Sequence, residues 1–397
     1  MPPIDFAGDW QTTFGPMQLT QRSGRIQGHY TYMGVECAVS GKIANGRLVF
    51  TYQEPDVRGE GWFEAVRSGR AFAGQFRPDG GTWEKWEGER IGFDGLWNSS
   101  FGLMRLIEEG DQVHGYYEVG GSATIAGERK GNQLSFRYRE PQTRGRGRFE
   151  LADGGLSFQG EWRERGETAW KPWQGIRVRP QPNLTWLVVL EAPWQKFLSD
   201  QEYSFGHMLR EFFARVQGLQ VRHRFFTNEA GLRKCCRDLL YIAEPVVLVI
   251  ATHALPGGIS VDGQTIEVAA LVDILKHAGN VRALHFSACL LMQDPAVEAQ
   301  FRKLSAETGV AISGYRTSVD WAASALIEFT FLEMLLSRKL EPAAAATQLL
   351  KLLPFAGPAM PDDSVFRAAD FTIVLPGDPG ATNGRPAHSK PRRKIRR

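Results

Sequence analysis

Two residues of complementary chemistry each close a short apolar run. His253 ends the run 246–253, and Cys289 ends the run 281–289. A thiol and an imidazole held side by side support nucleophilic catalysis, because the imidazole takes up the thiol proton and later passes a proton to the leaving group. The residue types therefore point to covalent catalysis, provided that the fold brings the two side chains together.

The elements around these residues are expected to do so. Both runs are typical of strands buried on both faces of a parallel sheet. Between them lie a turn at Gly257 and Gly258 and an amphipathic helix over 268–277. A strand, helix and strand of this length form a right-handed βαβ unit, which leaves both carboxyl ends at the ligand-binding edge of the sheet. His253 and Cys289 should therefore meet at that edge.

Length and composition limit the class of protein. A chain of 397 residues with a net charge of +3 predicts two or three domains and gives no reason to expect nucleic-acid binding by the whole protein. The sequence contains no apolar run long enough for a membrane span, and its first residues show no secretory signal pattern. Its four cysteines lack paired spacing, which favours a cytoplasmic location and free thiols.

The first half of the chain is an internal duplication. The segment 9–17 returns as 96–104, and the turn 54–59 returns as 140–145. Trp83 and Trp86 likewise match Trp170 and Trp173. Each copy reads as about eight short strands of alternating polarity separated by glycine turns, which is typical of an antiparallel meander closed into a barrel.

We therefore expect one β-barrel repeat over residues 1–90 and another over 91–179. Their layout resembles the avidin or lipocalin type of small barrel in architecture only, so no ligand site is transferred from those families. The repeated tryptophans and arginine turns either pack the barrels or hold a ligand or an activating partner. Carbohydrate or cell-wall binding by residues 1–180 is a further alternative.

After a linker with two prolines, strands and helices alternate. We expect a three-layer α/β domain over 184–376, built around a mostly parallel sheet. The predicted strands are 184–190, 220–226, 246–253, 281–289, 310–313 and 371–375. The predicted helices are 203–216, 229–242, 268–277, 295–308, 321–337 and 342–353. The last segment, 377–397, is polar and basic and is expected to be disordered. A solubilising tail is the favoured interpretation, and contact with nucleic acid or anionic lipid is the alternative.

These residues resemble the caspase-fold cysteine peptidases, a clan that includes metacaspases, clostripain and the bacterial CHAT peptidases. The likeness covers 184–375. The segment 288–292 is similar to the clostripain nucleophile segment, and 312–320 is similar to the CHAT segment that follows the nucleophile. The fold class implied by the whole chain is thus two β-barrel repeats followed by a caspase-like α/β domain.

The resemblance implies that Cys289 is the nucleophile and His253 its base. It also implies that the amides of Gly257 or Gly258 and of Cys289 form the oxyanion hole. Taken singly, such a cysteine is usually core filler and such a histidine a satisfied polar residue; their joint placement favours a site. No cluster with metal-ligand spacing and no phosphate loop occurs in the sequence, so no cofactor is expected.

Two departures from the family bear on specificity. Three residues, 254–256, precede the glycines, where the family usually has glycine directly after the histidine. Relatives that cut after lysine or arginine carry an acid two residues before the cysteine, and this chain has Ser287 there. Asp262, Asp294 and Asp320 are the other candidates for the S1 pocket, although Asp320 equally fits the cap of a helix.

The sequence therefore predicts a cytoplasmic cysteine endopeptidase that cleaves a protein substrate by limited proteolysis, as a bacterial effector or defence peptidase. Defence-associated relatives cleave gasdermin-like proteins, which makes such a protein a candidate partner. The alternative is a catalytically silent caspase-like scaffold whose barrels bind a ligand or partner.

Overall fold

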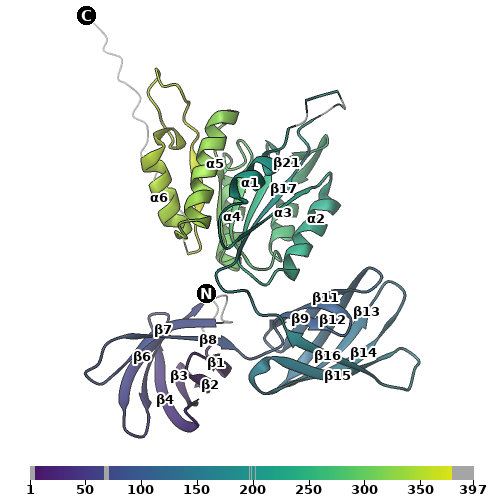
Figure 1. Cartoon of the computed structure of the whole chain (residues 1–397), viewed down its shortest axis with the longest axis vertical. Coiled ribbons are helices and arrows are strands. Elements are labelled where there is room, and N and C mark those ends of the chain that lie inside the picture. The colour runs from purple at the N-terminus through teal and green to yellow at the C-terminus, as the bar shows by residue number, and fades with distance from the viewer. Residues whose placement is uncertain (1–4, 67–70, 196, 198, 202, 378–397) are drawn as a thin grey trace, which may run out of the picture. The chain divides into compact units, whose positions relative to one another are not determined.

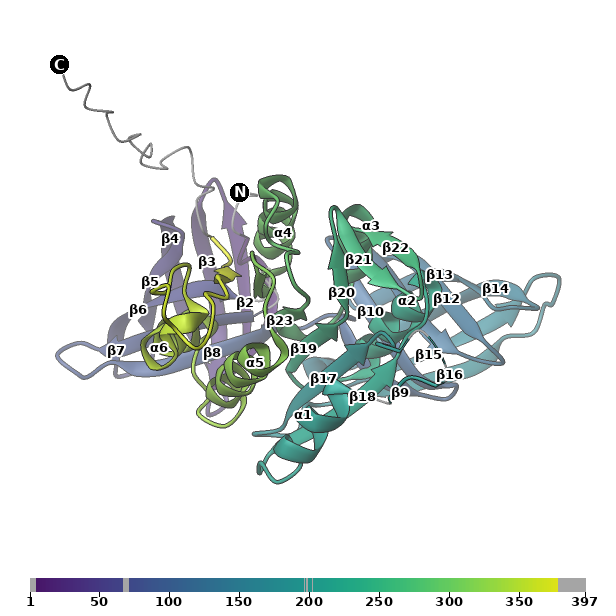
Figure 2. The ribbon, with the colours of Figure 1, turned by 90° about the horizontal axis from the view of Figure 1, so that it is seen from above.

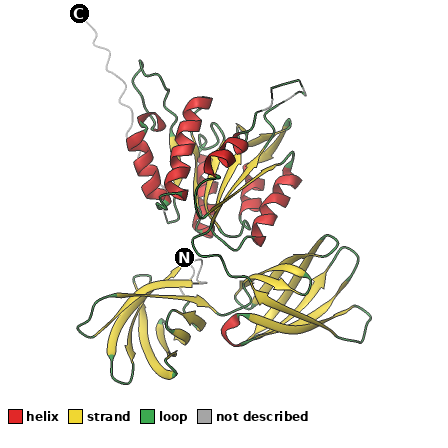
Figure 3. Cartoon of the chain, viewed as in Figure 1, coloured by secondary structure: helices red, strands yellow, loops and turns green. Residues whose placement is uncertain are grey.

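The computed structural model describes residues 5–66, 71–195, 197, 199–201 and 203–377. It separates the chain into two compact units, which are treated one at a time below. One comprises Met1–Leu184 with Arg237–Pro245, and the other Thr185–Cys236 with Val246–Arg397. Figure 3 shows that strands dominate the first half of the chain and that helices and strands mix in the second. The basic tail predicted over 377–397 lies, apart from Gly377, outside the described residues.

The first half forms two closed antiparallel barrels of eight strands each, as the sequence predicts (Figure 1). Each strand pairs with the next along the chain, and the first strand of each barrel pairs with the last. Barrel 1 contains β1 (Gly8–Thr12), β2 (Gly15–Arg22), β3 (Arg25–Tyr32), β4 (Val35–Ala44), β5 (Arg47–Gln53), β6 (Arg58–Val66), β7 (Ala71–Pro78) and β8 (Glu84–Arg90). Barrel 2 contains β9 (Gly95–Ser99), β10 (Gly102–Glu109), β11 (Gln112–Glu118), β12 (Ser122–Lys130), β13 (Gln133–Arg139), β14 (Arg144–Leu151), β15 (Ser157–Glu164) and β16 (Lys171–Arg177).

Alternating side chains fill the interior of each barrel. Strand β5 alternates buried and exposed positions along its whole length, because successive side chains of a strand point to opposite faces. The buried positions carry aromatic rings that surround Trp86 in barrel 1 and Trp173 in barrel 2. Eight-stranded barrels have an interior of about the size that side chains can fill, so the tryptophans at these two positions serve packing.

The second unit is an α/β domain around a six-stranded sheet in the order β18-β17-β19-β23-β24-β25. All neighbouring pairs are parallel except β24 with β25. The strands are β17 (Thr185–Glu191), β18 (Leu219–Phe225), β19 (Val246–Ala251), β23 (Val281–Ser287), β24 (Ala311–Tyr315) and β25 (Phe371–Val374). This mixed, mostly parallel sheet confirms the fold class expected from the alternation of strands and helices.

Helices cover both faces of this sheet, and Figure 2 shows α1, α5 and α6 on one side with α3 and α4 on the other. The helices are α1 (Phe205–Phe213), α2 (Glu229–Asp238), α3 (Val268–Leu275), α4 (Pro295–Thr308), α5 (Trp321–Leu336) and α6 (Pro342–Leu352). One core cluster joins one face of β17 and β19 to α1, α5 and α6. None of the helices among the described residues has the length and apolar character needed to cross a membrane.

A small three-stranded antiparallel sheet follows β19 and was not predicted. It contains β20 (His253–Leu255), β21 (Gly258–Val261) and β22 (Gln264–Glu267). The prediction of one strand over 246–253 was therefore wrong at its end, because β19 stops at Ala251 and His253 begins β20. The predicted strand over 281–289 likewise stops two residues early, at Ser287.

Candidate active site

The two strands that lead to His253 and Cys289 are parallel neighbours. Strand β19 pairs with β23 along its length, and Ala251 opposite Ser287 is the last pair in the ladder. The amide of Thr252 then donates to the carbonyl oxygen of Ser287 at 3.1 Å. His253 and Cys289 each lie two residues beyond this last pair, at the carboxyl edge where open α/β sheets place their ligands.

The His253 side chain is exposed and is held from one side by an aromatic ring. Its imidazole packs edge-on against the indole of Trp194, with ring centroids 4.7 Å apart and planes at 85°. Its backbone pairs with Ser260 in the small sheet. Thr252, the residue before it, is buried, and its hydroxyl donates to the carbonyl oxygen of Ser260 at 2.6 Å. The histidine therefore has a fixed backbone and an imidazole open to solvent.

Cys289 is partly buried and has a free thiol. The amide of Val319 lies 3.4 Å from its Sγ, in a position to donate a hydrogen bond. The next residue, Leu290, has a φ of +65° and a side chain that is 40% exposed. A left-handed backbone at a non-glycine residue is strained, and such strain gathers at functional sites. The thiol thus sits on a sharp turn with an amide aimed at its sulfur.

Among the described residues, no hydrogen bond joins Cys289 to His253. Catalytic hydrogen bonds are often long in a free enzyme and tighten when substrate binds. The geometry therefore places both groups at one sheet edge, with the thiol in contact with Val319 and the imidazole in contact with Trp194.

A buried carboxylate at the end of β17 organises the His253 side of this edge. Glu191 is fully buried. Its oxygens accept hydrogen bonds from Trp194 Nε1 at 2.5 Å and from Ser204 Oγ at 2.6 Å. The amides of Phe205 and Gly206, at the start of α1, also donate to it. The hydrogen bond to Glu191 holds the indole of Trp194 in place, and that indole packs against the imidazole of His253. The carboxylate therefore positions His253 indirectly, through Trp194.

The charge of Glu191 follows from these contacts. His223 Nε2 lies 2.8 Å from its Oε2. Burial by itself would raise the pKa of Glu191, but hydrogen bonds from His223, Ser204, Trp194 and Gly206 outweigh it and hold the pKa below its usual value. The carboxylate is therefore ionised at neutral pH, at the N-terminal end of α1, where negative charge is stabilised by the helix dipole.

A second buried carboxylate lies on the Cys289 side. Glu328, on α5, is fully buried, and its Oε1 accepts hydrogen bonds from Ser287 Oγ and Tyr315 Oη, each at 3.0 Å. His285 Nε2 lies 3.4 Å from the same oxygen. Burial, followed by the charge of Glu328 and its hydrogen bond, raises the pKa of Tyr315 well above its usual value, so this hydroxyl remains a donor. The network fixes the end of β23, two residues before Cys289.

Three aromatic side chains link the two sides. The ring of Tyr203 lies 6.1 Å from that of Trp194 and 4.2 Å from that of Trp321, measured between centroids. Trp321 is 45% exposed and begins α5, two residues after Val319. Burial, and then the charges of Glu191 and Glu328, raise the pKa of Tyr203. This row of rings runs from the imidazole to the loop that contacts the thiol.

The two glycines predicted for the oxyanion hole lie in the small sheet. Gly257 has a φ of +85° at the turn between β20 and β21, a conformation that favours glycine. A Cβ atom on Gly258 would lie 2.3 Å from the carbonyl oxygen of Ile266, because β22 passes close by. Hairpin geometry thus accounts for both glycines, and their role toward an oxyanion stays a prediction.

The four S1 candidates differ in their surroundings. Ser287 lies at the end of β23 and donates to Glu328. Asp294 caps α4 by accepting from the amide of Ala296, and Asp320 caps α5 by accepting from the amide of Ala323. Asp262 is exposed at the turn between β21 and β22, with a φ of +46°. Ser287, the last residue of β23, is therefore the candidate nearest to Cys289 in sequence.

Sequence reasoning missed the residues that surround His253 and Cys289. One signal was available: a single acid closes the otherwise apolar strand that ends in Glu191, and Glu328 lies inside a largely apolar helix. Charged residues are rarely fully buried without partners, so both positions could have been marked as polar centres. The aromatic row of Trp194, Tyr203 and Trp321 had no signal, because its members meet only through the fold.

Comparison with known proteins leaves the family open. No family model matches the chain, and no curated protein matches it. Among solved structures, Myxococcus xanthus hemagglutinin in complex with a3,a6-mannopentaose is 11% identical, covering 40% of this chain and 86% of that one, with a TM-score of 0.14. Burkholderia oklahomensis agglutinin is 12% identical, covering 40% and 82%, with a TM-score of 0.13. Intact Ap-TbpB is 8% identical, covering 43% and 45%, with a TM-score of 0.16. Scores this low carry no argument about fold or ligand.

Proposed function

We propose that this chain is a cysteine endopeptidase in which Cys289 is the nucleophile and His253 the general base and acid. The observation that carries the proposal is the register of two neighbouring parallel strands, which ends at Ala251 opposite Ser287 and leaves both reactive residues just beyond. The caspase-fold resemblance of the sequence agrees with this position. The strain at Leu290 and the amide of Val319 aimed at Sγ support it further.

The proposed reaction follows the chemistry of a thiol and an imidazole. His253 takes the thiol proton, and Sγ of Cys289 attacks the peptide carbonyl carbon, so that a C–S bond forms and the carbonyl electrons move to oxygen. The intermediate collapses, the C–N bond breaks, and the imidazolium gives its proton to the departing amine. A water molecule, deprotonated by His253, then hydrolyses the thioester and restores the thiol.

Backbone amides would stabilise the oxyanion in this reaction. The amide of Cys289 and that of Gly257 or Gly258 are the proposed donors, and each such donor contributes about 3–4 kcal/mol in other proteases. Ser287, with Glu328 behind it, adjoins the proposed nucleophile and is the favoured wall of the S1 pocket. Limited proteolysis of a protein partner fits a site built on one sheet edge, and a gasdermin-like protein is the partner that the resemblance implies.

Cleavage of a diverse peptide library, read by mass spectrometry, tests the proposal. The wild-type chain should cut peptide bonds, and Cys289→Ala should lower the rate by more than about a thousandfold. His253→Ala should lower it strongly, whereas Cys235→Ala, which changes a partly buried cysteine in α2, should leave it unchanged.

Two results would contradict it. If Cys289→Ala cleaves as fast as wild type, the nucleophile is another residue. If the wild-type chain cleaves nothing, with or without a candidate protein partner, the silent scaffold becomes the better account.

A further inference from the structure

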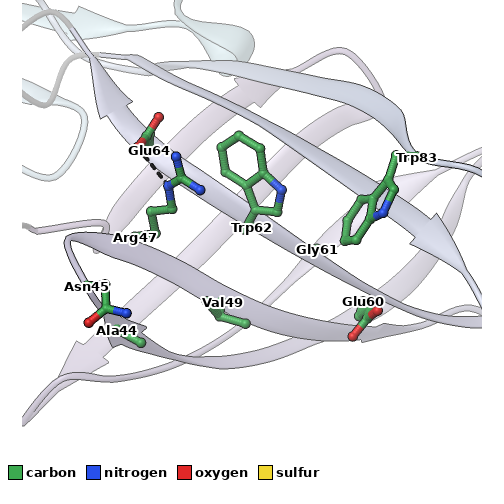
Figure 4. Close-up of a pocket in the computed structure, with 9 residues that line it drawn as sticks. All are labelled: Ala44, Asn45, Arg47, Val49, Glu60, Gly61, Trp62, Glu64 and Trp83. Carbon is green, nitrogen blue, oxygen red and sulfur yellow. Dashed lines mark hydrogen bonds and ion pairs between the residues drawn. The ribbon is translucent and has the colours of Figure 1, made fainter.

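Barrel 1 carries a groove on its outer face. The groove has a volume of about 470 Å³ and lies over β5, β6 and the segment before β8. It is lined by Ala44, Asn45, Arg47, Val49, Glu60, Gly61, Trp62, Glu64 and Trp83. Figure 4 shows the indole of Trp62 between Arg47 and Trp83. Phe63, next in sequence to Trp62, points into the barrel and is fully buried, so the groove lies outside the core.

Apolar side chains form part of the groove surface, between polar ones. Trp83 is 42% exposed, and Val49, which pairs with Trp62 across the strands, is 44% exposed. Isolated exposed apolar residues need no explanation, but a concave apolar group rimmed by polar side chains marks a ligand site. The volume falls within the usual range for small-molecule pockets.

The charges around the groove are already paired. Arg47 Nε lies 2.7 Å from Glu64 Oε1, and its guanidinium is 4.4 Å from the centroid of the Trp62 ring. Arg77 pairs with Glu60, and its guanidinium is 4.6 Å from the centroid of the Trp83 ring. Each cation thus has a carboxylate partner and a ring beneath it. The groove therefore offers donors and acceptors without an excess of either charge, which favours a neutral ligand.

Barrel 2 provides an internal control, because the strand register is the same. Trp62 opposite Val49 in barrel 1 corresponds to Arg148 opposite Ser135 in barrel 2. Trp83 corresponds in sequence to Trp170. That ring is surrounded by the guanidinium groups of Arg146, Arg148 and Arg163, at 5.9, 5.4 and 4.6 Å. Barrel 2 folds with Arg148 and Ser135 at the positions of Trp62 and Val49. The tryptophan and the apolar residue at these two positions are therefore specific to barrel 1.

We propose that this groove binds a neutral oligosaccharide. The C–H face of a pyranose ring is weakly positive and stacks on the negative face of an indole, and two neighbouring indoles suit two consecutive rings. Sugar hydroxyls can donate to Glu60 and Glu64 and accept from Asn45 and Arg47. The proposal concerns barrel 1 alone and goes beyond the peptidase activity, on which it does not rest.

The test uses the full-length chain with a printed array of neutral glycans, followed by titration calorimetry with the best hit. Cellohexaose, chitohexaose, laminarihexaose and mannohexaose are included as soluble probes, with decaproline as a peptide probe. Trp62→Arg, which copies barrel 2, and Trp83→Ala should each weaken saccharide binding by about tenfold or more. Trp170→Ala is the matched control in barrel 2 and should leave the affinity unchanged.

The result expected is saccharide binding that Trp62→Arg and Trp83→Ala reduce while the melting temperature stays that of wild type. The proposal is overturned if no glycan binds, or if Trp170→Ala weakens binding as much as Trp62→Arg does. Binding of decaproline in place of saccharides, lost in Trp62→Arg, would assign the groove to an extended peptide instead. Loss of peptide cleavage in Cys289→Ala would leave all these outcomes untouched.

Discussion

In barrel 1 the hydroxyl of Tyr30 donates to Glu54 at 2.6 Å, and in barrel 2 the hydroxyl of Tyr117 donates to Glu140 at 2.7 Å. The same partly buried contact occurs at the same place in both copies. The α/β unit also buries carboxylates, but Glu191 and Glu328 have no repeated counterpart, and their hydrogen bonds lead to the edge with His253 and Cys289.

This difference separates side chains that both copies of a fold need for packing from side chains that occur once and are available for a functional site. Buried groups that the duplication keeps in both barrels, such as the Trp86 and Trp173 rings, serve packing that any copy of the fold needs. What occurs once is free to serve a site. The groove of barrel 1 follows the same logic, because Trp62 is replaced by Arg148 in barrel 2 while Phe63 is matched by Phe149.

The largest expected effect on stability comes from Glu191→Ala. The change leaves the donors of Trp194, Ser204, Phe205 and Gly206 without their acceptor in a buried place. We expect a loss of about 3–5 kcal/mol in the free energy of unfolding of the α/β unit, measured by chemical denaturation. Glu229→Ala, which removes an exposed ion pair on α2, should change it by less than about 1 kcal/mol. Equal losses in the free energy of unfolding for the two variants would contradict the view that the hydrogen bonds of Glu191 stabilise this unit.

The pH dependence of the same unit follows from the lowered pKa of Glu191. A carboxyl group whose pKa is lower in the folded state stabilises the fold above its unfolded pKa and stops doing so as the pH falls through the folded value. The unit should therefore lose stability below pH 4.5, the usual value for glutamate. In Glu191→Gln this acid-dependent part should be smaller, as thermal melts across pH would show.

A smaller and paired effect is expected in the barrels. Tyr30→Phe and Tyr117→Phe each leave a carboxylate without its hydroxyl donor, and each should cost about 1–2 kcal/mol. The two losses should be alike, because the contact is duplicated. Hydrogen exchange of the full-length chain, read separately over each barrel, measures both. A large effect in one barrel alone would mean that the repeated contact has different roles.

Alkaline pH sharpens this comparison. Burial, and then the hydrogen bond and charge of the glutamate partner, raise the pKa of Tyr30 and of Tyr117. The folded state favours the protonated phenol, so its contribution is complete below the unfolded value of 10.0 and declines progressively as the pH rises above it. Both barrels should weaken above pH 10, and the double variant with both phenylalanines should weaken less steeply.

The smallest effect concerns the contact between Trp194 and His253. Trp194→Ala removes the ring beside the imidazole and should slow peptide cleavage by about tenfold. Trp194→Phe keeps a ring at that place but loses the donor to Glu191, so it should restore much of the rate. A rate that falls equally in both variants would show that the hydrogen bond, rather than the ring, positions His253.

Local pattern accounts for most of the fold. The barrel strands were predicted from alternating polarity. Helix α4 was predicted over the residues that it occupies, 295–308, where Asp294 and Pro295 mark its start. The small sheet after β19 was missed, because strands of three or four residues carry too little periodicity to be recognised. The ends of β19 and β23 were placed two residues too late, since no glycine or proline directly follows the last ladder pair to mark where each strand stops.

The site was less predictable than the fold. Strand order follows from the βαβ rule, so the sequence could place His253 and Cys289 near one edge. The groups that hold them come from far along the chain: Ser287 meets Glu328, and Trp194 meets His253, only after the sheet has formed. The sequence near these residues does not predict such contacts. Likewise, Trp62 and Trp83 could not be distinguished from core tryptophans before the inner and outer faces of the barrel were known.

The central claim is that Cys289 is the accessible nucleophile of a dyad with His253. Its most direct test is covalent labelling with a panel of peptide acyloxymethyl ketones that differ at P1, with the adduct located by peptide mass mapping. The account predicts a single adduct on Cys289, absent in Cys289→Ala and much slower to form in His253→Ala. An adduct on Cys37, Cys235 or Cys236, or none on any cysteine of the folded wild-type chain, would contradict it.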